Sequence, residues 1–278
     1  MSEQQRNSWT AATEELGELN VDDGGIDTTV PHSARIWNYW LGGKDNFPVD
    51  QRAGDEYAQT FPGIFELARS SRAFIGRAVT HLAADHHIAQ FLDIGTGLPT
   101  ENNTHQVAQR ANPRAHIVYV DNDPLVLTHA EALLTSNLEG STQYIEADLR
   151  RPDLILERAR NLLDFDQPIA VMLMGILGHI ATHDQARTII GDLMQGVPAG
   201  SFLALYDGTA TNPDLLSAQE GYDDTGAVPY KLRHPDQITA FFDGLEVLPP
   251  GIVPIHQWRP TTADPVPVDA HGGIGRKP

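Results

Sequence analysis

Short apolar runs alternate with amphipathic stretches through the middle of the chain. Five runs have the length of strands, and they cover residues 89–94, 116–121, 143–146, 168–174 and 201–206. The first, 89–94, has the composition of a strand buried on both faces, and 168–174 is strongly apolar. Between them, apolar residues at helical spacing predict helices over about residues 100–110, 123–134, 152–163 and 184–195. This alternation requires right-handed crossovers, so the sequence predicts an α/β fold with a doubly wound, mostly parallel sheet.

The flanking regions follow other patterns. Residues 31–41 and 64–85 each have one apolar face at helical spacing, which predicts a helical layer before the first strand. Helices near 213–219 and 235–242 precede two short strands, 245–248 and 253–258, which we expect to pair antiparallel at the sheet edge and bring the sheet to seven strands. The polar ends of the chain are expected to be flexible tails. The predicted division is a tail (1–30), a helical cap (31–88), an α/β binding domain (89–259) and a second tail (260–278).

Charge and composition narrow the classes of partner. Acidic residues number 37 against 19 basic ones, a net charge of −18, which repels phosphate backbones and anionic lipid. Nucleic acid and membranes are therefore not expected partners, and nothing indicates an oligomeric state. The chain has no cysteine, no apolar leader and no apolar run long enough to span a bilayer, so a cytoplasmic location is expected. No residue spacing indicates a metal site.

The first predicted strand ends in a glycine turn. Asp93 is followed by Gly95, Thr96 and Gly97, and the two glycines let the backbone turn tightly and approach a ligand without a Cβ in the way. Thr100 is the expected N-cap of the next helix. The same residue stands where the dinucleotide-binding fingerprint needs its third glycine. This departure favours a ligand without phosphates, and S-adenosylmethionine is the candidate.

Acidic residues also end the next two strands. Asp121 is expected to accept hydrogen bonds from both ribose hydroxyls, and Asp148 from the exocyclic amine of adenine. The fourth strand ends in apolar residues, including Met174, that suit the cover of an adenine or a sulfonium. Because carboxyl ends of parallel strands meet at one edge, these groups should converge, together with their neighbours Asn122 and Leu149. Taken alone, a strand-terminal aspartate is often a turn or cap residue, which is the better explanation for Asp123.

Four segments resemble an actinobacterial family of S-adenosylmethionine-dependent methyltransferases that was first described as a domain of unknown function. They are FLDIGTGLPT (91–100), VYVDNDP (118–124), EADLR (146–150) and, upstream, ARIWNYWLGGKDNF (34–47). The resemblance spans about residues 31–258 and implies the class I methyltransferase fold, a Rossmann-like three-layer sandwich with N-terminal helices over the cofactor. It implies contacts of Asp93, Gly95 and Gly97 with the methionine end, of Asp121 with the ribose and of Asp148 with adenine.

Two features qualify the resemblance. Pro99 stands where the general methyltransferase pattern has a third glycine. Residues 70–74 are similar to a segment of carboxyl methyltransferases in which an arginine holds the cofactor carboxylate, and this makes Arg72 a candidate because a guanidinium matches a carboxylate bidentately. A surface arginine is the alternative reading. Tyr39, Lys44 and Asn46 are weaker candidates for the same wall.

Methyl transfer from a sulfonium mainly requires alignment of the reactants and exclusion of water. His179, shortly after the fourth strand, is the candidate general base, followed by His183, Tyr206 and Asp207. A small-molecule acceptor of unspecified identity is expected. Two alternatives remain: a protein that binds S-adenosylmethionine without transferring its methyl group, and a nicotinamide-dependent oxidoreductase, which Thr100 disfavours.

Overall fold

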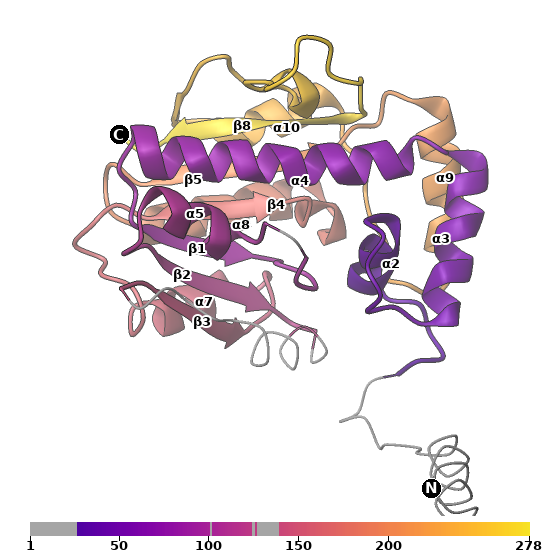
Figure 1. Ribbon diagram of the computed structural model, residues 1–278, viewed down its shortest axis with the longest axis horizontal. Helices are drawn as coiled ribbons and strands as arrows, with labels where there is room; N and C mark the ends of the chain where they lie inside the picture. The colour runs from indigo at the N-terminus through magenta and orange to yellow at the C-terminus, as the bar shows by residue number, and fades with distance from the viewer. Residues whose placement is uncertain (1–26, 101, 124–125, 127–138) are drawn as a thin grey trace, which may run out of the picture.

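Five parallel strands form the centre of the sheet in the computed structural model, which describes residues 27–100, 102–123, 126 and 139–278 (Figure 1). The strands are β1 (Gln90–Ile94), β2 (His116–Asp121), β3 (Ser141–Glu146), β4 (Ala170–Met174) and β5 (Phe202–Gly208). Their order is β3-β2-β1-β4-β5, so the direction of winding reverses beside β1. The predicted α/β fold with a doubly wound, mostly parallel sheet is confirmed.

Alternate residues of these strands pack against opposite helical layers. Phe91 of β1 belongs to one hydrophobic core, whereas its neighbour Leu92 belongs to the other. On the first face lie α4 (Ile64–Thr80) and α5 (Thr104–Ala111), and on the second lie α7 (Pro152–Ala159), α8 (His183–Gly196) and α10 (Pro235–Thr239) (Figure 1). Burial on both faces explains why β1, β4 and β5 are largely apolar runs rather than alternating ones. The edge strand β3 is only partly buried and is more polar.

The helical layer before β1 contains one more helix than the sequence indicated. Between α2 (Ser33–Trp40) and α4 lies α3 (Pro48–Thr60), and α3 packs against α9 (Pro213–Asp223) from the far end of the chain (Figure 1). Pro48 opens α3, and the carboxylate of Asp50 caps it by accepting from the Phe47 N–H at 2.9 Å.

One predicted helix start is wrong. The helix after the glycine turn begins at Thr104 rather than near Thr100, because Asn103 and Gln106 form the capping box. The helix predicted over 123–134 lies outside the described residues, apart from Asp123 and Val126.

The predicted C-terminal tail is also wrong. Residues Ala270–Arg276 form β8, which lies antiparallel to β5 inside the sheet. The short strands β6 (Glu246–Val247) and β7 (Val253–Pro254) each pair with β8 instead of with one another, and the sheet therefore has eight strands. Two glycines of β8 are required by packing: a Cβ on Gly272 would collide with the Leu205 carbonyl, and one on Gly273 would lie 2.7 Å from Ile252.

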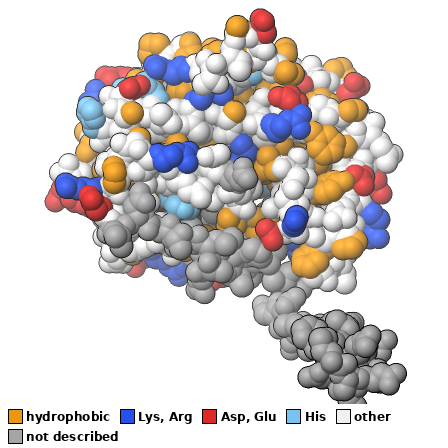
Figure 2. All heavy atoms as spheres, viewed as in Figure 1, with side chains coloured by type: hydrophobic (Ala, Val, Ile, Leu, Met, Phe, Trp, Pro, Cys, Tyr) orange, Lys and Arg blue, Asp and Glu red, His pale blue; other side chains and the backbone are white. Residues whose placement is uncertain are grey.

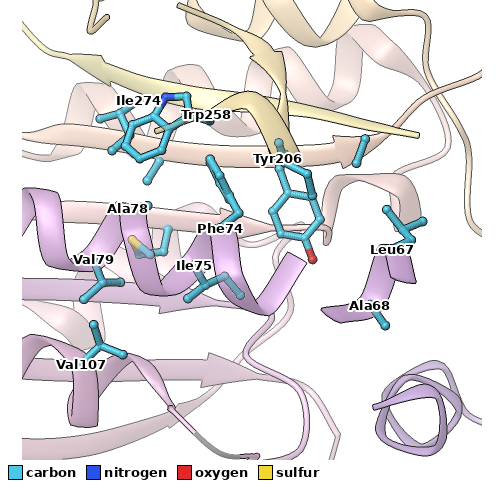
Figure 3. Close-up of a cluster of buried hydrophobic side chains, with 14 of the residues drawn as sticks. Leu67, Ala68, Phe74, Ile75, Ala78, Val79, Val107, Tyr206, Trp258 and Ile274 are labelled. Atoms are coloured by element: carbon cyan, nitrogen blue, oxygen red, sulfur yellow. The ribbon is translucent and has the colours of Figure 1, made fainter. Parts of the chain in front are cut away.

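An aromatic cluster fixes α4 on the sheet. Phe74 of α4 packs edge-to-face against Trp258, with ring centroids 5.4 Å apart, and against Tyr206 of β5 at 5.8 Å. Figure 3 shows Phe74 between these two rings. Arg72 lies two residues before Phe74 on α4. By fixing α4 on the sheet, the cluster therefore also fixes the position of Arg72.

On the face shown in Figure 2, acidic and basic side chains are interspersed with hydrophobic ones. Within the described part of the chain, no helix has both the length and the apolar character needed to cross a membrane.

The position of β8 predicts which C-terminal substitutions are costly. Ile274 of β8 is fully buried, so Ile274→Ala should lower the free energy of unfolding by about 2–5 kcal/mol. Val266, in the segment before β8, is 55% exposed, and Val266→Ala should change stability by less than about 0.5 kcal/mol. Urea denaturation measures both, and equal small effects would show that β8 is not part of the folded core.

Candidate active site

A cavity of about 290 Å³ opens at the carboxyl ends of β1 to β5. Most of the site residues predicted from the sequence line it. They are Arg72, Asp93, Gly95, Thr96, Gly97, Asp121, Asn122, Asp148, Leu149, Met174 and His179. Tyr39 does not line this cavity, because its hydroxyl is turned toward α3 and donates to Asp55 at 2.5 Å.

The two glycines of the turn have different tasks. Both have positive φ, +75° at Gly95 and +64° at Gly97, a conformation in which an L-residue is strained. A Cβ on Gly95 would collide with Ile176, so Gly95 permits close packing behind the turn. A Cβ on Gly97 would meet nothing within 4 Å, and Gly97 lines the cavity. Gly97 therefore leaves open space in which a ligand can approach the backbone.

Asp121 ties this turn to the end of β2. One carboxylate oxygen accepts from the Gly97 N–H at 2.8 Å, and the other from the N–H groups of Asn122 at 2.8 Å and Asp123 at 3.1 Å. Burial raises the pKa of Asp121, and these hydrogen bonds oppose that shift. An ionised carboxylate offers about four acceptor positions, so the group retains capacity for a ligand.

Asp93 and Arg72 lie at the same end of the cavity. Asp93 accepts from the Thr104 hydroxyl at 2.6 Å, and burial raises its pKa to about 6, although the nearby Arg72 guanidinium works in the opposite direction. Arg72 reaches toward the start of α5, where it donates to the Asn102 carbonyl at 3.3 Å. Burial lowers the pKa of Arg72, and the Asp93 carboxylate counteracts this effect.

Asp148 at the end of β3 has a partner that the sequence reading missed. The Arg150 guanidinium forms a bidentate ion pair with its carboxylate. Nε lies 2.9 and 3.1 Å from the two oxygens, and Nη2 lies 2.5 Å from one of them. These hydrogen bonds, led by those of Arg150, lower the pKa of Asp148 and keep it ionised. Arg150 itself lines the cavity.

His179 has a defined tautomer. Its Nδ1 lies 3.0 Å from the Pro229 carbonyl, which can only accept, so Nδ1 carries the proton and Nε2 keeps a lone pair. Burial lowers the pKa of His179, which favours the neutral ring at physiological pH. Of the weaker candidates, Tyr206 also lines the cavity, whereas His183 packs on Phe241 instead.

Asp207 is buried behind the cavity in an ion pair. Arg233 donates to its carboxylate at 2.9 Å, and the Tyr230 hydroxyl donates to the other oxygen. Arg233 also donates to the carbonyls of Leu177 and Ile180, both at 2.8 Å, and so holds the turn that carries His179. Asp207 is therefore a structural anchor rather than a group facing the cavity.

The cavity wall away from the strand ends was largely missed by the sequence analysis. It comes from α2, α3 and α9 and includes Trp37, Trp40, Tyr57, Leu215, Gln219 and Tyr222. Lys44 and Asn46 do not line the cavity. Asn46 instead donates to Asn38 at 2.9 Å and to the Gly43 carbonyl at 3.0 Å, closing the turn after α2. Among the described residues, no group of three or more His, Asp or Glu side chains is arranged to hold a metal ion.

The family model described as S-adenosyl methyltransferase matches residues 20–278. The chain belongs to this family. The family that the motifs predicted is thus confirmed. The cofactor of this family is S-adenosylmethionine, as the sequence predicted. The open space at Gly97 and the acidic residues at three successive strand ends fit a cofactor with ribose hydroxyls and amino groups.

Solved structures from actinobacteria are similar along almost the whole chain. A DUF574 family protein from Streptomyces avermitilis is 40% identical, with 91% of this chain and 99% of that chain covered and a TM-score of 0.87. A structure named a putative methyltransferase from Thermobifida fusca is 36% identical, with 93% and 99% covered and a TM-score of 0.85. An O-methyltransferase family protein from Burkholderia thailandensis, 16% identical, covers 99% of this chain and 69% of its own with a TM-score of 0.52 and shares the fold. Among curated proteins, none matches the chain significantly.

The buried ion pair predicts a large loss of stability on neutralisation. Asp207→Asn leaves the buried Arg233 charge without its counterion and should lower the free energy of unfolding by about 3–5 kcal/mol. The Arg187–Asp243 pair has the same 2.9 Å separation but lies at the surface, so Asp243→Asn should cost less than about 1 kcal/mol. Chemical denaturation compares the two variants, and equal losses would rule out a special role for the buried pair.

The raised pKa of Asp93 predicts a pH dependence. Folding raises this pKa from 3.8 to about 6, so the folded protein retains a proton that the unfolded chain releases, and Asp93 lowers stability as the pH rises through this window. Asparagine cannot ionise. Relative to the unaltered protein, Asp93→Asn should therefore gain stability on the order of 3 kcal/mol between about pH 4 and about pH 7. The measurement is the difference in unfolding free energy across this range, with the exposed Asp192→Asn as control; a flat difference would contradict the shift.

Proposed function

We propose that the protein transfers the methyl group of S-adenosylmethionine to a small-molecule acceptor. The observation that carries this proposal is that one cavity contains both the glycine turn with its strand-end aspartates and a neutral histidine with an unprotonated Nε2. A site built for binding alone has no use for such a base. Its presence next to the cofactor end of the cavity supports an enzyme.

The proposed contacts follow from the donors and acceptors of the cofactor. Asp121 accepts from the ribose hydroxyls, while Asp148 accepts from the adenine amine with a lone pair that Arg150 does not use. Arg72 pairs with the methionine carboxylate and Asp93 with the amino group beside it. Apolar contacts with adenine come from Leu149 and Met174. The remaining contacts are made by the backbone of Gly95, Thr96 and Gly97 and by Asn122.

The protein's own part in the reaction is alignment, exclusion of water and removal of a proton. S-adenosylmethionine supplies a methyl group made electrophilic by its sulfonium. The apolar wall from α2, α3 and α9 keeps water from the reacting atoms and orients the acceptor. His179 receives the acceptor's proton on Nε2, because Nδ1 is already committed to the Pro229 carbonyl. Tyr39 is not assigned a role, since its hydroxyl faces Asp55.

Two alternatives remain distinguishable. A protein that binds the cofactor without turnover would have the same strand-end contacts but would form no S-adenosylhomocysteine with any acceptor. A nicotinamide-dependent oxidoreductase would bind NAD at the same strand ends, and membership of the methyltransferase family speaks against it.

The test is calorimetric titration of the full chain with S-adenosylmethionine, S-adenosylhomocysteine and NAD. We expect micromolar binding of the two adenosyl compounds and none of NAD. Asp121→Asn removes an acceptor for the ribose and should weaken binding of S-adenosylmethionine by about 1–3 kcal/mol, or roughly 5- to 150-fold. Asp153→Asn, at an exposed aspartate on α7, is the matched control and should bind normally. Unchanged affinity in a folded Asp121→Asn variant would refute the ribose assignment.

A further inference from the structure

The cavity is divided by charge. Among the described residues that line it, the aspartates and arginines are Arg72, Asp93, Asp121, Asp148 and Arg150, and all of them come from α4 or from the carboxyl-terminal ends of β1, β2 and β3 and the residues just after them. The lining contributed by α2, α3, α9 and residues 228–232 contains no aspartate, glutamate, lysine or arginine. The cofactor's charged groups therefore have partners in one half, and a charged acceptor would find none among the described residues of the other.

The uncharged half is walled by aromatic rings. Trp40 packs against Tyr57 with ring centroids 5.0 Å apart, and Tyr57 packs edge-to-face against Tyr222 at 6.1 Å. These rings are 6–7% exposed and line the cavity, while Trp37 extends the wall from Trp40 at 5.7 Å. Such a wall is matched by a flat, apolar molecule, because aromatic rings gain energy from edge-to-face and offset contacts with another ring.

Gln219 supplies a neutral polar group inside this wall. Its carbonyl oxygen lies 3.4 Å from the Tyr57 hydroxyl, and its amide donates to Asp223 at 3.0 Å. A glutamine side chain has two donors and two acceptor positions, so one of each remains for a ligand. Asp223 also accepts from the Tyr230 N–H, which connects Gln219 to the segment that holds His179.

We propose that the methyl acceptor is an uncharged aromatic molecule with a hydroxyl group, and that the product is its methyl ether. This inference rests on the proposed function and adds the substrate class. The ring occupies the half walled by Trp40, Tyr57 and Tyr222, Gln219 hydrogen-bonds a polar substituent, and the reacting hydroxyl faces Nε2 of His179.

The reaction balances with the groups named. The acceptor oxygen forms a bond to the methyl carbon as the bond from that carbon to sulfur breaks. The sulfur keeps the electron pair, and the hydroxyl proton passes to Nε2 of His179, from which it is later lost to water. A phenolic hydroxyl has a pKa of about 10, whereas water has a pKa of roughly 16. The phenol's pKa is therefore far closer to that of an imidazole, and a histidine base suits a phenol.

A carboxylate acceptor does not fit this half of the cavity. Its charge would be buried with no lysine or arginine in the surrounding lining, which is costly. The base His179 would also be unnecessary, because an ionised carboxylate has no proton to give up. These two points separate the proposal from methyl ester formation.

The test compares three probes on the full chain saturated with S-adenosylhomocysteine. The probes are 1-naphthol, which is uncharged at neutral pH, 1-naphthoic acid, which is ionised, and cyclohexanol, which is not aromatic. Calorimetry should show that 1-naphthol binds at least about tenfold more tightly than either of the others. With S-adenosylmethionine instead, mass spectrometry should detect 1-methoxynaphthalene and an equal amount of S-adenosylhomocysteine.

The outcomes distinguish this inference from the proposed function. Normal binding of S-adenosylhomocysteine with no binding of 1-naphthol, or with equal or tighter binding of 1-naphthoate, would overturn the acceptor class and leave the cofactor assignment standing. Failure of S-adenosylhomocysteine itself to bind would overturn the proposed function and the inference with it.

A variant tests the role of Gln219 separately. Gln219→Leu keeps a similar volume and removes the hydrogen bonds, so binding of 1-naphthol should weaken roughly three- to tenfold while binding of S-adenosylhomocysteine stays the same. Glu220→Gln, at the adjacent exposed residue of α9, is the control and should change neither affinity. Full affinity of folded Gln219→Leu for 1-naphthol would show that Gln219 does not contact the acceptor. The comparison of probes needs no variant and stands even where Gln219→Leu does not fold.

Discussion

The buried pair of Arg233 and Asp207 connects three segments that are far apart in the sequence. Asp207 belongs to β5, while Arg233 follows the segment that carries Tyr230, and the guanidinium also binds the carbonyls of Leu177 and Ile180 after β4. The chain pairs the charges and satisfies the guanidinium with backbone oxygens, as burial of an ion pair requires. His179 lies in the turn that these bonds hold. The position of His179 in the cavity therefore depends on an ion pair that does not itself face the cavity.

A second buried ion pair also connects separate segments of the chain, here in the helical layer. Asp50 of α3 is bound by Arg35 of α2, with 3.1 Å between Nε and one oxygen, and also accepts from the His32 N–H at 2.9 Å. Arg35 in turn donates to the Val30 carbonyl at 2.6 Å. One carboxylate thus caps α3 and fixes the start of α2. The α2–α3 part of the cavity wall and the turn at residues 177–180 are thus each anchored by an arginine and an aspartate that do not line the cavity.

The two halves of the cavity differ in how well the sequence predicted them. The half proposed to hold the cofactor is local. Asp93 is the second-last residue of β1, Asp121 ends β2, and Asp148 follows β3 by two residues, so finding the strand also finds the residue. The other half is assembled by tertiary packing, as when Tyr57 and Gln219 meet across 162 residues. No motif marks either residue, and ordinary amphipathic helices such as α9 give no indication of what they face. The prediction that Tyr39 lines the site was wrong for a related reason. Helical spacing alone did not show which face of α2 meets α3. Glycine-rich β8 was missed because its close packing, rather than apolar side chains, makes it a strand.

The charge division also bears on how the product leaves. Among the described residues, three aspartates and two arginines line the half proposed to hold the cofactor, so these groups leave one excess negative charge when all are ionised. S-adenosylmethionine carries an ammonium, a sulfonium and a carboxylate and is a net cation, which this half attracts. Transfer of the methyl group turns the sulfonium into a neutral thioether, and the attraction weakens at the moment the product forms. The uncharged half has no charged side chain among its described lining residues, so its contacts are not altered by this change of charge. In the proposed mode of binding, these charges thus favour S-adenosylmethionine over S-adenosylhomocysteine without any movement of the aromatic wall.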